Sequence, residues 1–161
     1  MMIQIPDVHL STFAKAKGRA KVLIRSRTDP RHTGEFSVAI DMKFDPATDQ
    51  YPNGTLEIDI NLSDSVFGRV TSTTVEQLSY TGKHNPTVFA TGRCHVQSRE
   101  VDALSTECRY WLMMANNKER EQNLRSGTPD IISFLIYDRA GIVIAYGTGP
   151  ALEGDIEVTA R

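Results

Sequence analysis

Regular alternation of apolar and polar side chains is the feature that most constrains the fold of this chain. Between Phe36 and Phe44, and again between Leu56 and Leu62, every second residue is apolar. Successive side chains of a β-strand point to opposite faces, so this pattern predicts two strands, each with one buried and one wet face. Turn-forming residues, among them Pro52 and Gly54, separate the two strands.

The remaining sequence continues the β pattern and offers little helix. Further strands are predicted at 66–80, 88–96, 108–114, 131–137, 142–146 and 154–159. The first of these has no clean apolar face, which indicates a bulge or an edge position. Only the polar segment 116–125 resembles a helix, so we expect at most one short surface helix. About eight or nine strands predict one all-β domain over 1–161, a predominantly antiparallel sandwich or barrel, with the sandwich preferred.

Composition fits an ordinary globular protein. Hydrophobic residues make up 40% and charged residues 24% of the chain, which argues against disorder. The N-terminal residues carry no signal-peptide pattern, and no apolar run approaches the ~18 residues that a transmembrane helix needs. We therefore expect a protein of the reducing cytoplasm with no membrane contact.

Basic residues occupy alternate positions near the start of the chain. This basic stripe consists of Lys15, Lys17, Arg19, Lys21, Arg25 and Arg27. It is either a solvated strand that faces acids on neighbouring strands, or a track for nucleic acid or another polyanion. The first interpretation is preferred, because the net charge is −2 and residues 14–31 contain no aromatic side chain on which a base could stack.

The segment 131–146 is apolar on both faces of its two predicted strands, which flank a turn at 138–141. These strands are either central and covered on both sides, or one face lines a ligand pocket or an oligomer interface. The candidate pocket or interface residues are Phe134, Ile136, Ile142, Ile144 and Tyr146.

The two cysteines are too few for a disulfide scaffold. A hairpin that turns about Val101 would place Cys94 opposite Cys108 and Gly92 opposite Tyr110. It would also place Ala90 opposite Leu112. We expect the two sulfurs to be cross-strand neighbours and reduced.

The sequence predicts no catalytic residue, no cofactor and no metal ligand. Cys94 and His95 would point to opposite faces of a strand, so they cannot easily share a zinc ion with His84 or Cys108. The segment Gly147-Thr148-Gly149 lacks the spacing of a phosphate loop, and we interpret it as a glycine-rich connection between strands.

Three functions remain open. The leading hypothesis is a non-enzymatic structural or interaction module that assembles as a homo-oligomer. The alternatives are a β-barrel that binds a small apolar molecule, with or without an enzymatic activity, and a polyanion-binding module that uses the basic stripe.

Overall fold

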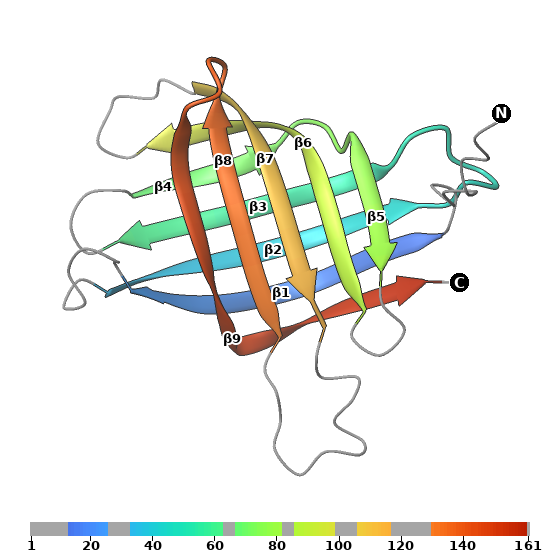
Figure 1. Ribbon diagram of the computed structural model, residues 1–161, viewed down its shortest axis with the longest axis horizontal. Coiled ribbons are helices and arrows are strands. Elements are labelled where there is room, and N and C mark those ends of the chain that lie inside the picture. Colours follow the sequence, from blue (N-terminus) through green and yellow to red (C-terminus); the bar gives the residue numbers. More distant parts are fainter. Residues whose placement is uncertain are drawn as a thin grey trace, which may run out of the picture.

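The computed structural model describes residues 13–25, 33–62, 67–81, 86–98, 106–116 and 130–160, which form nine strands (Figure 1). The strands are β1 (Ala14–Arg25), β2 (Thr33–Phe44), β3 (Asn53–Leu62), β4 (Phe67–Ser72), β5 (Gln77–Thr81), β6 (Thr87–Ser98), β7 (Thr106–Ala115), β8 (Ile131–Asp138) and β9 (Val143–Ala160). The predicted antiparallel all-β class is confirmed. The described ranges contain no helix, and 117–125 of the expected surface helix lie outside them.

The strands form one sheet that closes into a ring. Their order is β4-β3-β2-β1-β9-β8-β7-β6-β5, and β4 also pairs with β6. Strands β4 and β5 pair with successive stretches of β6, at 94–98 and 87–91 respectively. They therefore act as one strand that is interrupted at 73–76. This interruption confirms the irregularity expected in 66–80.

Strand β9 passes from one layer of the molecule to the other. In Figure 1, β5 to β8 and the first half of β9 form one layer, and β1 to β3 cross behind it. The first half of β9 pairs with β8 and the second half with β1. The expectation of two strands joined by a glycine-rich connection is therefore wrong. Gly147 in the first half of β9 packs closely against both layers, since a Cβ there would lie 2.9 Å from Phe134 Cε1 and 3.2 Å from Phe36 Cε1.

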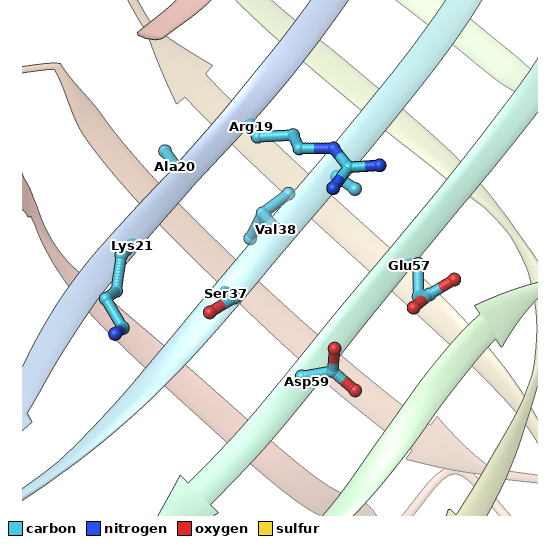
Figure 2. A pocket seen from close by; sticks show the side chains of 8 residues that line it. Arg19, Ala20, Lys21, Ser37, Val38, Glu57 and Asp59 are labelled. Atoms are coloured by element: carbon cyan, nitrogen blue, oxygen red, sulfur yellow. The ribbon is translucent and has the colours of Figure 1, made fainter. Parts of the chain in front are cut away.

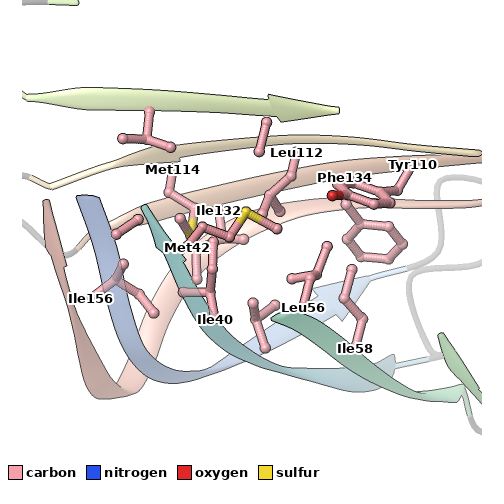
Figure 3. Close-up of a cluster of buried hydrophobic side chains, with 14 of the residues drawn as sticks. Ile40, Met42, Leu56, Ile58, Tyr110, Leu112, Met114, Ile132, Phe134 and Ile156 are labelled. Atoms are coloured by element: carbon pink, nitrogen blue, oxygen red, sulfur yellow. The ribbon is translucent and has the colours of Figure 1, made fainter. Parts of the chain in front are cut away.

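The interior of the ring is filled by apolar side chains from both layers (Figure 3). The rings of Phe36 from β2 and Phe134 from β8 meet edge to face in this interior, with centroids 4.7 Å apart. The alternation in β2 and β3 is confirmed, since the predicted inward residues are buried; these are Phe36, Val38, Ile40, Met42, Leu56, Ile58 and Ile60.

The register of β6 and β7 is the one expected from the sequence. Cys94 lies opposite Cys108, with Cα atoms 4.9 Å apart, and Gly92 lies opposite Tyr110. The two sulfurs form a disulfide, so the expectation of reduced thiols is wrong in this structure. Directly opposed positions of an antiparallel pair bring two cysteines within the range that a disulfide spans.

Tyr110 ties the β6–β7 pair to the interruption between β4 and β5. Its ring lies over Gly92, and its hydroxyl donates a hydrogen bond of 2.8 Å to the carbonyl oxygen of Thr74. Burial raises the pKa of Tyr110 above its ordinary value, so the hydroxyl remains a donor. A Cβ at position 92 would lie 2.1 Å from that carbonyl oxygen and 2.6 Å from Tyr110 Oη.

We predict that Gly92→Ala lowers the free energy of unfolding by about 3 kcal/mol or more, because a rigid backbone oxygen occupies the space of the new methyl group. Gly141→Ala is the control. Gly141 has a positive φ of 82° but no atom within 4 Å of an added Cβ, so only backbone strain of about 1 kcal/mol is expected. Urea unfolding of both variants measures the difference, and equal losses would contradict the steric explanation.

Candidate functional site

The basic stripe lies on the outer face of β1. Lys15, Lys17, Arg19 and Lys21 alternate there with side chains that point into the core. Arg25 is the last residue of β1, and Arg27 lies outside the described residues. The structure therefore brings four of the six predicted cations into one row.

Acids stand beside this row on both neighbouring strands. On β9, three acids lie directly opposite three residues of the stripe, in the pairs Lys17–Glu157, Arg19–Asp155 and Lys21–Glu153. On the β2 side, Lys21 Nζ lies 3.5 Å from Glu35 Oε1. The register therefore sets acids of β9 beside three of the four described cations, whereas Lys15 lies opposite Thr159 of β9 and Lys43 of β2.

A hollow with a volume of about 420 Å³ lies over β1, β2 and β3 (Figure 2). Arg19 and Lys21 line it from β1, and Glu57 and Asp59 line it from β3. Arg69 of β4 reaches the same two acids, with its Nε 2.8 Å from Asp59 Oδ1 and 3.3 Å from Glu57 Oε1. The hydrogen bond to Asp59 raises the pKa of Arg69. The hollow therefore has mixed charge rather than a cationic lining.

The five candidate pocket residues do not share one surface. Phe134 and Ile136 are 1% and 0% exposed in the core, whereas Ile142, Ile144 and Tyr146 are 63%, 39% and 58% exposed. The register of β8 and β9 explains the difference from the expected set, because Leu135 lies opposite Tyr146, so even-numbered residues face inwards on β8 but outwards on β9. A β-bulge beyond this pair brings Val143 to the outer side as well. Ile136 lies opposite Ala145 but the next residue of β8 lies opposite Val143, so Ile144 is the extra residue and the alternation shifts there.

The exposed residues belong to a larger apolar area on the outside of β6 to β9. Trp111, Leu135 and Tyr146 lie directly opposite one another across three strands. The Phe89 ring lies 6.1 Å from the Trp111 ring, centroid to centroid. We call this area the outer apolar face; it consists of Phe89, Trp111, Met113, Ile131, Leu135, Tyr137, Ile142, Val143, Ile144 and Tyr146, all half-buried or exposed.

Sequence reasoning found only part of this face. It recognised two-sided apolar strands at 131–146 but missed Phe89, Trp111 and Met113. The signal was present in β7, where Tyr110 and Leu112 alternate with the two apolar residues that face outwards. A strand that is apolar on both faces needs a cover on each.

Charged side chains bound one end of the outer apolar face. Arg93 of β6 lies directly opposite Arg109 of β7, and Glu76 bridges them. Its carboxylate oxygens lie 3.3 Å from Arg93 Nε and 2.9 Å from Arg109 Nη1. In the turn after β8, Arg139 Nη1 lies 3.2 Å from Glu107 Oε2.

The described ranges contain no group of three His, Cys, Asp or Glu side chains that could hold a metal ion. His84 lies outside these ranges. Among the described residues, no helix has the length and apolar character needed to span a membrane. A scan against protein-family models and searches of curated proteins and of solved structures gave no match.

We predict that the wild-type protein elutes from a heparin column at low salt, because acids on β9 and β2 compete for the cations of the basic stripe. Reversing Lys17 and Arg19 to Glu should therefore change the elution little. Retention well above physiological salt that these reversals abolish would instead support a polyanion track.

Proposed function

We propose that this protein is a non-enzymatic interaction module that self-associates through the outer apolar face, with a second copy of the chain as the partner. The supporting observation is the in-register row Trp111–Leu135–Tyr146, which continues into the exposed residues around Ile144. Four strands contribute to one continuous apolar surface, whereas scattered apolar residues would need no explanation.

The size of the outer apolar face suits an interface. Large aromatic side chains have areas of about 150–250 Å² each, so ten partly exposed residues present on the order of 600 Å². This lies at the upper end of what a typical monomer exposes and approaches the ~800 Å² that each partner of a stable complex buries. The two aromatic residues of the central row, Trp111 and Tyr146, are of the type that dominates binding energy.

A second copy fits because the face is compatible with twofold symmetry. A symmetric dimer needs a patch that can pack against itself. A twofold axis that runs across the strands, in the plane of the interface, sets the charged end of each copy against the opposite end of its partner. That end carries Ser133 and Thr148, whose hydroxyl groups form a hydrogen bond with each other, with their oxygens 2.7 Å apart. Arginines of the two copies then stay apart.

The two alternative functions receive less support. The described part of the barrel interior is filled by side chains such as Phe36 and Phe134, so a small apolar ligand would have to displace them. Three of the four described cations of the basic stripe lie opposite acids of β9, which weakens attraction for a polyanion. Disulfides persist mainly in oxidising compartments, so Cys94–Cys108 does not favour the cytoplasmic location that the sequence suggests.

We predict that Ile144→Asp converts a wild-type oligomer into a folded monomer. The new charge would be buried in the interface of the oligomer but solvated in the monomer. The dissociation constant of the oligomer should therefore rise by about tenfold or more, while the monomer stays folded. Sedimentation velocity measures the oligomeric state, and circular dichroism measures the fold. Phe134→Asp should instead unfold the chain, because its side chain is 1% exposed.

Leu23→Asp is the matched control. Leu23 is 41% exposed, close to the 39% of Ile144, but it lies on β1 outside the outer apolar face. This variant should keep the wild-type oligomeric state. A wild-type protein that stays monomeric at high concentration, or equal dissociation by the control, would refute the proposal.

A further inference from the structure

A second hollow, with a volume of about 410 Å³, lies beyond the charged end of the outer apolar face. Three arginines line it from three different elements: Arg93 from β6, Arg109 from β7 and Arg139 from the β8–β9 turn. We propose that this hollow binds the phosphate group of a small phosphomonoester. The proposal does not rest on self-association.

The charge balance of the hollow favours an anion. Arg93 and Arg109 occupy directly opposed strand positions, where two like charges destabilise the sheet. A single carboxylate, Glu76, serves both guanidinium groups. With Glu107 paired to Arg139, three positive groups share two negative ones, and one positive charge remains unbalanced.

The arginines keep hydrogen-bonding capacity for a ligand. A guanidinium group has five N–H donors, and the ion pairs within the described residues use one nitrogen of each arginine. The side chains of Arg93, Arg109 and Arg139 are 64%, 55% and 82% exposed. A phosphate oxygen can therefore reach them, and paired N–H groups of arginine match the geometry of phosphate.

Two further groups add polar contacts at the same place. His95 lines the hollow, and its imidazole ring carries an N–H group. Thr74 Oγ1 accepts a hydrogen bond of 2.9 Å from the Arg93 backbone N–H, which leaves the hydroxyl proton to donate. The hollow thus offers N–H and O–H donors to the acceptor oxygens of a phosphate.

The volume of the hollow indicates the class of ligand. Cavities of about 300–1,000 Å³ hold whole small molecules, so 410 Å³ leaves room beside a phosphate group for a small organic part. A phosphomonoester supplies both. Free phosphate and sulfate share the anionic chemistry but lack the organic part.

The test compares thermal unfolding in glycerol phosphate, sodium phosphate and sodium sulfate with sodium chloride at equal ionic strength. A ligand at tenfold excess over its Kd should raise the Tm by about 3 °C or more. We expect glycerol phosphate to give the largest shift, phosphate a smaller one and chloride none. The same Tm in all four salts would overturn the proposal. A rise in Tm with sulfate but not with glycerol phosphate would overturn the assignment of a phosphomonoester.

Variants locate the site by isothermal titration with glycerol phosphate. Arg109→Gln and Arg139→Gln should each weaken binding about tenfold, as expected for loss of a charged hydrogen bond. Arg139 lies in an exposed turn, so its variant should fold normally. Glu76→Gln should tighten binding, because the competing carboxylate is removed.

Arg69→Gln is the control, since its side chain is 54% exposed and paired with two acids but lies outside the hollow. Equal weakening by the control would place the binding elsewhere and refute the site.

Discussion

The pairing of β9 with both β8 and β1 holds the two layers of this protein together. Eighteen residues, Val143–Ala160, form hydrogen bonds with one layer in their first half and with the other in their second. Because the strand is continuous, no loop has to carry unsatisfied backbone groups across the core. The change of partner falls between Pro150, which lies opposite Ile131 of β8, and Ala151, which lies opposite Val22 of β1.

The two faces of the sheet serve different physical roles. Inward positions are occupied by residues such as Leu112 and Ile132, which pack across the layers in Figure 3. Outward positions differ between the layers. On β1 to β3 they carry charges of both signs, which need only water and one another. On β7, β8 and the first half of β9 they are largely apolar, and the free energy of covering them is available to a partner.

Much of the fold could be predicted from the sequence, because alternation reports directly on which face a strand residue occupies. The β6–β7 register followed from a hairpin that turns about Val101, and the resulting pairing of Cys94 with Cys108 was correct. The outer surface was harder to predict. The β8–β9 register sets even-numbered residues of the two strands on opposite faces, and two strands that are apolar on both faces give no sign of that register. A bulge at Ile144 then shifts the alternation by one residue. The bridging role of Glu76 was equally hidden, because it depends on the path of 73–76 beside β6.

The first and last strands of the ring are neighbours, and this has a consequence for folding. Contacts between β1 and β9 join positions such as Ala16 and Val158, so forming them requires a large loss of chain entropy. Pairs of consecutive strands are more local and form at lower entropic cost, which makes ring closure a late event. Until then β1 presents an open edge that another chain could extend. Lysines on an edge strand discourage such pairing, and three of the four described cations of the basic stripe on β1 are lysines.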